Sequence, residues 1–564
     1  MKPIFIITLA LIITCQTAHL YSITTIMQSL KKDLKGICHN LRDIQQDAPV
    51  TDKRPLNIKP KSHLPQTCKN VKHPDYLNNI KSIKNSMQSL QKMNNDLLNN
   101  VNQLEKDYND SIDDILEENN EPNMPIAEKT HDTKNTCFCQ PCTITQPGSY
   151  ILCDHVNGPI TINANNVALS LNGYTVVPKA GNPYGIKING SQVCVYDGFI
   201  LGNPQTPVGI DIANARNVKI ENIQVSDFPS TGIALSAAQG CVIQFCTIDS
   251  LTKTGSGINI VNTTGCVIQH CIMLGKKIGL VLENTADSTF EHLNITNCLQ
   301  SGIELHNSVY NVFCRCDTSN ILNNTEPWFA YGIALFNSEH NTFQECIVNN
   351  VTANSINPPE NYSAAGIFLF ESNNNKIVDC KIELIKGENN LSAYGIFINL
   401  IPPSAPSLNN IIKNNIINNV ISANVSCGIQ TNGSNTIIEK NTITNVTGTD
   451  NSGPGNGASG IYCNINSSNN AINKNIITDI VNISGGVPTK AYGIFVDDNS
   501  DYNIITKNRV TKSYYGFKTG TATHNSILGN NTNNNTTPYD GVGIFSQDAS
   551  AALSPNYMVN YFHS

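Results

Sequence analysis

The chain has 564 residues, more than one ordinary compact core holds, so either several domains or an elongated repeat architecture is expected. Only 14% of the residues are charged, and the net charge is −7 with no basic cluster along the sequence. Uncharged polar residues, above all asparagine, replace the missing charge. This composition permits a full core and argues against nucleic acid as a partner.

Residues 1–22 are expected to be a signal peptide, because Met-Lys-Pro precedes the apolar run "IFIITLALIIT" at 4–14. That run is shorter than the roughly 20 residues that span a bilayer, which disfavours the alternative of a membrane anchor. A second alternative is a lipid on Cys15, but Thr14 stands where a lipoprotein signal has a smaller residue. We therefore expect a secreted, periplasmic or cell-surface protein, in which disulfides are permitted.

Two helical segments are expected next, at residues 23–48 and 76–118, with a proline-rich linker at 49–75 between them. In the longer segment, apolar residues from Ile80 onward step by three and four, which is the pattern of a coiled coil. Asn94 falls at a core position, where such residues set the register. We favour a homo-oligomer formed through 76–118, and the alternative is that the shorter helix folds back on the longer one.

A second linker at 119–142 ends in the cysteine-rich stretch "CFCQPC" at 137–142. Together with Cys153, these cysteines offer four thiolates, which is a zinc-ligand set. Disulfides at the cap of the following domain are the preferred interpretation, because export favours oxidised cysteines.

From residue 143 to 550, a glycine followed by an alternating apolar strand recurs, and a tail follows at 551–564. The apolar period of two excludes helical repeats, and a unit of two or three short strands must stack on copies of itself to bury its apolar side. The fourteen glycine strands are "YGIKI" (184–188), "VGIDI" (208–212), "TGIAL" (231–235), "SGINI" (256–260), "IGLVL" (278–282), "SGIEL" (301–305), "YGIAL" (331–335), "AGIFL" (365–369), "YGIFI" (394–398), "CGIQT" (427–431), "SGIYC" (459–463), "YGIFV" (492–496), "YGFKT" (515–519) and "VGIFS" (542–546).

This glycine strand, the second strands such as "NTFQECIV" (341–348), and the stretch "ITINANNVALSLNGYTVV" (160–177) resemble right-handed parallel β-helix repeat proteins. That pectate-lyase-like superfamily includes pectin-degrading enzymes, alginate epimerases and phage tailspikes, and the repeat is most similar to the NosD-like periplasmic type. The resemblance implies an all-β right-handed parallel β-helix solenoid of about 14 coils after the N-terminal α-helical coiled coil. It says little about activity, because the fold hosts unrelated functions.

The second strand of each unit contributes one residue to a column of equivalent positions. In the earlier units this residue is apolar or a cysteine, and in the later units it is an asparagine. In a parallel stack, equivalent side chains lie above one another, so we expect a buried amide ladder and buried free thiols. The repeated heptapeptides "GCVIQFC" (240–246) and "GCVIQHC" (265–271) would then be one strand on two adjacent coils. The column contains Ile223, Cys246, Cys271, Leu293, Cys316, Cys346, Cys380, Asn415, Asn441, Asn475, Asn508 and Asn530.

Acidic and histidine residues collect at the outward positions of the middle glycine strands. Glu304, His306 and Glu283 form a candidate catalytic acid/base set, since glycoside hydrolysis uses two carboxylates beside the scissile bond. An acidic pair on an exposed strand is more often only solubilising. The residue sets of pectin hydrolases and the Asp-Pro-His of epimerases are absent from the sequence. We leave catalysis open and lean against it.

Aromatic residues then continue along the same outward positions, beside longer insertions. A groove floored by aromatic rings and edged by polar loops suits a long, weakly charged glycan. The alternative is that the loops or a partner chain cover the stripe. The candidate carbohydrate-binding residues are Phe336, Phe368, Phe370, Phe397, Tyr462, Phe495 and, in an insertion, Trp328.

No cofactor or metal is expected. "VDDNSD" at 496–501 offers oxygen ligands without the spacing of a calcium loop, and no methionine or histidine cluster suits copper. The sequence therefore predicts an exported, oligomeric protein that binds polysaccharide or a surface protein without catalysis. The alternatives are a polysaccharide-active hydrolase, lyase or epimerase, and a NosD-like metal-maturation protein.

Overall fold

The computed structural model describes residues 136–250, 252–324, 329–354, 363–399, 407–449, 457–483, 490–521, 524–540 and 544–546. The expected signal peptide, both expected helical segments, their linkers up to residue 135, Trp328 and the tail lie outside the described residues. No helix among the described residues is long and apolar enough to cross a bilayer.

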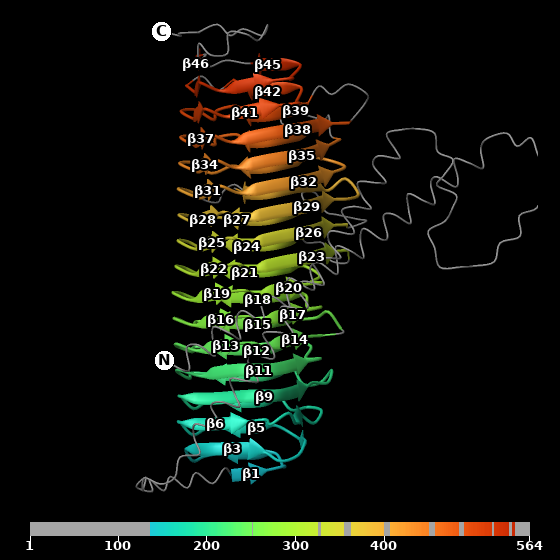
Figure 1. The fold of residues 1–564 in the computed structure, drawn as a ribbon, viewed down its shortest axis with the longest axis vertical. Helices are drawn as coiled ribbons and strands as arrows, with labels where there is room; N and C mark the ends of the chain where they lie inside the picture. The colour runs from blue at the N-terminus through green and yellow to red at the C-terminus, as the bar shows by residue number, and fades with distance from the viewer. Residues whose placement is uncertain are drawn as a thin grey trace, which may run out of the picture. The chain divides into compact units, whose positions relative to one another are not determined.

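The described residues form stacked coils of parallel strands, which run from β1 at one end to β46 at the other (Figure 1). One sheet, here called the glycine sheet, has 16 strands and takes one strand from each coil. Its strands are β2 (Cys142–Ile144), β5 (Ile160–Ile162), β8 (Tyr184–Ile188), β10 (Val208–Ala213), β12 (Thr231–Ser236), β15 (Ser256–Val261), β18 (Ile278–Glu283), β21 (Ser301–His306), β24 (Ala330–Phe336), β27 (Ser363–Phe370), β30 (Ser392–Asn399), β33 (Ser426–Thr431), β36 (Ala458–Cys463), β39 (Ala491–Val496), β42 (Tyr515–Thr519) and β45 (Thr537–Asp540).

The other sheet has 30 strands and is here called the bent sheet, because most coils contribute two strands separated by a corner. Its first strands are β1 (Thr136–Phe138), β3 (Gly148–Leu152), β4 (Val156–Asn157), β6 (Val167–Ser170), β7 (Thr175–Val177), β9 (Val193–Leu201) and β11 (Lys219–Ser226). The pairs that follow are β13 (Val242–Gln244) and β14 (Thr247–Asp249), β16 (Val267–Gln269) and β17 (Ile272–Leu274), β19 (Thr289–Glu291) and β20 (Asn294–Thr296), β22 (Val312–Cys314) and β23 (Asp317–Asn323), β25 (Thr342–Gln344) and β26 (Ile347–Ala353), β28 (Lys376–Val378) and β29 (Lys381–Gly387), β31 (Ile411–Lys413) and β32 (Ile416–Ser422), β34 (Ile437–Glu439) and β35 (Thr442–Gly448), β37 (Ala471–Asn473) and β38 (Ile476–Asn482), β40 (Ile504–Thr506) and β41 (Arg509–Thr511), and β43 (Ser526–Leu528) and β44 (Asn531–Asn533), with β46 (Ile544–Ser546) last.

The glycine of each repeat is required where the two sheets approach each other. A Cβ atom on Gly302 would lie 2.6 Å from the backbone oxygen of Gly332 and 2.7 Å from the Thr318 side chain. Neither distance leaves room for a side chain, so glycine is the residue that fits. The next residue, Ile303, is buried and pairs in register with Ile333 of the following coil. The expected inward isoleucine and leucine positions are confirmed.

The expectation for the C-terminal end of the repeat is wrong. "VGIFS" at 542–546 was expected to be the fourteenth glycine strand, but β46 pairs with β43 in the bent sheet. The last place in the glycine sheet belongs to β45, which pairs with β42 and has no glycine. At the other end, β2 and β5 add coils that lack the motif, so the glycine sheet has two more strands than the fourteen expected.

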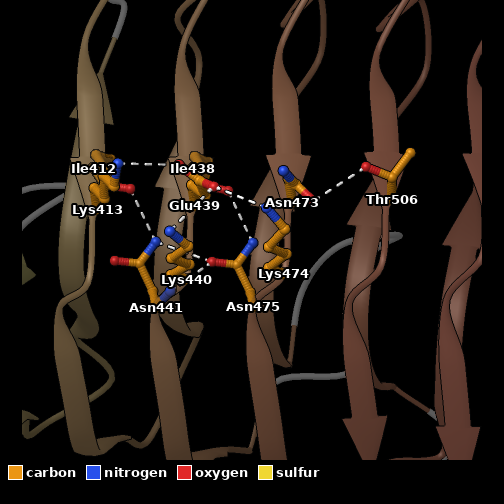
Figure 2. A network of polar contacts seen from close by, with 10 residues as sticks. All are labelled: Ile412, Lys413, Ile438, Glu439, Lys440, Asn441, Asn473, Lys474, Asn475 and Thr506. Atoms are coloured by element: carbon orange, nitrogen blue, oxygen red, sulfur yellow. Dashed lines mark hydrogen bonds and ion pairs between the residues drawn. The ribbon is translucent and has the colours of Figure 1, made fainter.

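The expected asparagine ladder is present and fully buried. The side chain of Asn475 donates to the backbone oxygen of Ile438 at 2.9 Å and to Oδ1 of Asn508 at 2.9 Å. Asn441 repeats the pattern one coil earlier, with bonds of 3.0 Å to the Ile412 oxygen and to Asn475 Oδ1 (Figure 2). Each amide therefore joins neighbouring coils through groups that would otherwise be buried without partners.

A second buried ladder runs parallel to the first and was not identified from the sequence. Asn311 donates to Oδ1 of Asn341, and Asn341 donates to Oδ1 of Asn375. A column of serines accompanies it, in which the backbone N–H of Ser338 donates to Oγ of Ser372. Together with the first ladder, three polar columns thus line the interior of the coils.

The cysteines of the first column are buried free thiols, as expected. Cys246 and Cys271 lie on adjacent coils, and each donates its S–H to the backbone oxygen two residues earlier. Near the first coil, Cys137 and Cys153 form a disulfide, while Cys139 and Cys142 are free. The preferred disulfide interpretation of the cap is confirmed for this pair, and it removes two of the four thiols that the zinc alternative needs.

A lysine stands in a core position. Lys276 is 0% exposed, and its Nζ donates to the backbone oxygen of Phe228 at 2.8 Å. The equivalent positions of the following coils carry Cys298 and Ile321, both buried. Burial lowers the pKa of Lys276 to about 8, although the nearby carboxylates of Asp249 and Asp227 oppose this effect.

The ladder predicts that Asn475→Ala destabilises the protein by about 3 kcal/mol, because it leaves several buried polar groups without partners. The backbone N–H of Asn441 donates to Asn475 Oδ1, so its hydrogen exchange should also accelerate. Chemical unfolding and exchange mass spectrometry measure the two effects. The control is Asn473→Ala, two residues earlier on the outer face, where a change below about 0.5 kcal/mol is expected. Equal losses in both variants would contradict the ladder's role.

The buried lysine predicts a pH dependence that Lys276→Met removes. The unfolded chain binds a proton at Lys276 up to a pKa of about 10.4, whereas the folded protein releases it near pH 8. The unfolded state thus binds more protons between these values, so the stability of the wild type relative to Lys276→Met rises with pH across this window. The expected gain is about 3 kcal/mol. Unfolding free energies of both proteins from pH 7 to 11 test this, and a difference that is flat or falls over that range would refute it.

Candidate functional site

The structure brings two of the three candidate catalytic residues together on β21. Glu304 is 5% exposed, and its Oε1 accepts hydrogen bonds from Ser301 Oγ at 2.6 Å and Gln300 Nε2 at 3.3 Å. Nε2 of His306 lies 3.3 Å from the other carboxylate oxygen. The residues alternate along one strand, so both side chains emerge on the outer face of the glycine sheet. The result is a carboxylate held in place by a hydroxyl and an amide, with an imidazole beside it.

The neighbouring coil completes this arrangement. The ring of His306 stacks on Phe336 of β24, with centroids 4.9 Å apart, which fixes the plane of the imidazole. Tyr331 is buried on the same strand, and burial and the Glu304 charge raise its pKa well above the usual value. Glu283 pairs with His306 in the strand register and is exposed, but no hydrogen bond or ion pair within the described residues joins the two side chains. A positioned carboxylate–imidazole pair is the arrangement that general acid/base chemistry uses.

The outward aromatic residues pack against one another. Phe368, Phe397, Tyr462 and Phe495 are all buried, and Phe336 and Phe370 are half-buried. Their rings contact tyrosines that the sequence analysis did not single out: Tyr331 lies 4.8 Å from Phe368, and Tyr492 lies 4.9 Å from Phe495. These residues form a second apolar cluster outside the main core. Of the six candidates, Phe336 and Phe370 present the most accessible ring area.

A column of residues with positive φ marks the corner of the bent sheet, between its first and second strands on each coil. Most L-residues lose about 1 kcal/mol or more in this left-handed conformation, and asparagine and glycine tolerate it best. The column nevertheless contains few asparagines, and its side chains project outward next to the buried ladder. This corner column consists of Phe245, His270, His292, Arg315, Glu345, Asp379, Asn414, Lys440, Lys474 and Lys507.

The chemistry of the corner column changes along the coils. At its first end the ring of Phe245 stacks on His270 at 5.1 Å, and His270 stacks on His292 at 4.8 Å. In the middle, Arg315 and Glu345 form an ion pair of 2.7 Å. The last three members are lysines on consecutive coils, in a backbone conformation that residues other than glycine and asparagine adopt at a cost, so this segment is a candidate for a function.

These lysines belong to a basic patch that spans four coils, here called the basic column: Lys413, Lys440, Lys474, Lys507 and Arg509, of which the first three pair with Glu439. Figure 2 shows Lys413, Lys440 and Lys474 converging on Glu439, with nitrogen to oxygen distances of 3.4, 3.8 and 3.5 Å. Burial alone would raise the pKa of Glu439, but the hydrogen bond from Lys413 and the neighbouring lysine charges lower it overall. One carboxylate cannot neutralise five cations, so the surface keeps a positive excess.

The sequence analysis missed the basic column because its lysines stand 27 to 34 residues apart. A signal was present: each corner lysine directly precedes a ladder asparagine, in the dipeptides Lys440-Asn441, Lys474-Asn475 and Lys507-Asn508. The basic residues are therefore scattered along the sequence, but the fold brings them together into one cluster on the surface.

Metal ligands do not gather in the part of the chain that the structure describes, where no group of three or more histidine, cysteine or acidic side chains could hold an ion. In the stretch that offered oxygen ligands, Asp497 lies within hydrogen-bonding distance of the Tyr462 hydroxyl and Asp498 accepts from Thr521. Both carboxylates are thus engaged by protein groups.

Comparison with known proteins gives a family and several similar structures. The family described as "Right handed beta helix region" matches residues 149–275, 208–358 and 255–420. No curated protein sequence matches the chain.

Solved structures with a similar course include the A-module of the mannuronan C-5 epimerase AlgE4 from Azotobacter vinelandii, at 11% identity and a TM-score of 0.40, covering 67% of this chain and 90% of that one. A DFA-IIIase from Arthrobacter chlorophenolicus A6 matches at 10% identity and 0.30, covering 63% and 83%. The Dettilon tailspike protein matches at 17% identity and 0.29, covering 70% and 62%.

The family match extends from residue 149 to 420, and the same parallel pairing continues without a change of register pattern through β45. The expected fold is thereby confirmed for the described residues. The described residues form a parallel β-helix, and residues 149–420 of the chain match the right-handed β-helix family.

Proposed function

We propose that this protein is exported and binds a linear acidic polysaccharide along the basic column. The observation that carries the proposal is the placement of one corner lysine on each of three consecutive coils, at a rise of about 4.8 Å per coil. A lysine is a point charge on a flexible stem, suited to meeting charges repeated along a chain. A glycan with one carboxylate or sulfate per sugar presents such a series.

Apolar side chains flank the lysines and support a sugar ligand. Ile437, Ile476 and Ile504 lie on the strands that border the corner and are 41%, 46% and 53% exposed. Isolated exposed isoleucines need no explanation, but these three lie on the coils that carry the corner lysines, beside further exposed isoleucines such as Ile416. The C–H faces of sugar rings can pack on them while the acidic groups meet the lysines.

Oligomerisation through residues 76–118 and the absence of catalysis remain parts of this proposal that rest on the sequence. An oligomer would place several basic columns on one particle. Several weak contacts with one polymer then add through effective concentration.

The proposal predicts that the triple variant Lys440→Asn, Lys474→Asn and Lys507→Asn binds polygalacturonate or alginate about 10- to 100-fold more weakly than the wild type. Asparagine suits the left-handed conformation, so the fold should be retained. Isothermal titration calorimetry at low and high salt measures the affinity, which should fall with salt in the wild type.

The matched control is Lys512→Asn, a lysine of positive φ at a different corner, paired with Asp479. It should leave binding unchanged. Equal affinity of the triple variant and the wild type for the acidic polymer, or an affinity of the wild type that does not change with salt, would overturn the proposal.

A polysaccharide-active enzyme is the second candidate, and the Glu304–His306 pair is the observation that favours it. Glu304 would act as the acid/base group or orient His306, at the outer face of the glycine sheet. Glu283 is exposed on the neighbouring strand and would be the second carboxylate of a hydrolase.

This candidate predicts that wild-type protein changes an acidic polysaccharide chemically, and that Glu304→Gln slows the change by about 100-fold or more while leaving binding intact. Assays for reducing ends, unsaturated products and uronate composition cover hydrolases, lyases and epimerases. Glu283→Gln tests the second carboxylate. Binding without any product over long incubation would rule out the enzyme and support binding alone.

A further inference from the structure

A surface pocket of about 600 Å³ lies at the other corner of the bent sheet, away from the basic column. It spans the coils from β14 to β29, and its polar lining comes from Lys253, Asn297, Asn320, Asn350, Asn354 and Glu388. Its volume falls in the range of small-molecule sites. Neither the acid/base pair nor the basic column shares a residue with it.

We propose that this pocket binds a neutral sugar residue. Its lining contains one cation, Lys253, and one anion, Glu388, so it has no net charge with which to select an ionic ligand. Both side chains are exposed, and neither makes a hydrogen bond or ion pair within the described residues. They are free to bind hydroxyl groups.

The asparagines supply a set of amide groups repeated from coil to coil. Asn297, Asn320 and Asn350 have φ values of 60°, 55° and 56° and project outward at equivalent positions. Asn350 donates to Asn320 Oδ1 at 2.8 Å, and Asn320 donates to Thr296 Oγ1 at 3.2 Å. These bonds orient the amides and leave Oδ1 of Asn350 and the whole amide of Asn297 without a partner among the described residues.

Adjacent free donors and acceptors match the vicinal hydroxyl groups of a sugar, each of which both donates and accepts. Thr352 adds a hydroxyl group, and Asn354 keeps its Nδ2 donor while its Oδ1 accepts from Asn389 at 2.6 Å. Leu322 lines one side and is 43% exposed, which offers an apolar surface to a ring's C–H face. The pocket therefore combines the two kinds of contact that a pyranose makes.

A divalent cation fits this lining less well. Calcium requires six to eight oxygen ligands, whereas this pocket has one carboxylate and a lysine that repels a cation. An acidic sugar is disfavoured by Glu388 for the converse reason. A neutral sugar is therefore the ligand with which the amides, the hydroxyl group and both charged side chains of the lining can all form hydrogen bonds.

The test is calorimetric titration of the full chain with neutral di- and trisaccharides of glucose, mannose, galactose and xylose. Saturable binding of at least one of them is expected. Asn297→Gly and Asn350→Gly should each weaken it by about 10-fold, because they remove an amide while glycine keeps the left-handed backbone. Glu388→Gln should weaken it similarly.

The matched control is Asn445→Gly, at the same left-handed position two coils beyond the pocket's last strand, which should bind like the wild type. The triple lysine variant of the basic column should also bind neutral sugars normally, so failure of one proposal does not imply failure of the other. No saturable binding, equal binding by the pocket variants, or binding of Ca²⁺ that Glu388→Gln abolishes would each overturn the inference.

Discussion

The fold depends on one constraint: parallel pairing forces each coil to place its inward side chains at the same level as those of its neighbours. A buried amide survives there only because the next coil supplies the partner it needs. Asn475 illustrates this, since it donates to Ile438 on one side and to Asn508 on the other. A single asparagine in such a core would cost about 1–3 kcal/mol, whereas a column of them is self-consistent.

In the coils that directly precede the asparagine ladder, a cysteine occupies the same buried position of the column. The backbone N–H of Cys380 donates to Oδ1 of Asn415, so the change from cysteine to asparagine occurs between these two coils without an unsatisfied group. The buried position of each coil thus accepts only residues that match those of the neighbouring coils. The residue directly before that position points outward and is free of this constraint. That separation lets the corner column change from aromatic to charged to basic without disturbing the core.

Much of the fold was predictable because glycine spacing and apolar alternation repeat at every coil. The inward columns, the free thiols and the glycine strands followed from those periods. The terminal coils were misjudged because β45 carries "TPYD" in place of the motif. At the site, Glu304 and His306 could be placed on one face from strand geometry, but the hydrogen bonds from Ser301 and Gln300 depend on side-chain rotamers. The basic column could not be predicted without knowing that each coil turns through a left-handed residue at the corner. The only local sign of that residue is its position directly before a ladder asparagine.

The repeating corner lysine has a consequence for how a polymer would be held. A chain whose charges recur at the rise of the coils meets the same neighbours after shifting by one unit, so several alignments have equal energy. Their number adds a favourable statistical weight to association, and the bound chain can slide without full release. A surface built from equal steps is therefore suited to holding a long polymer in many equivalent positions. It is poorly suited to holding one particular bond of that polymer at a fixed place.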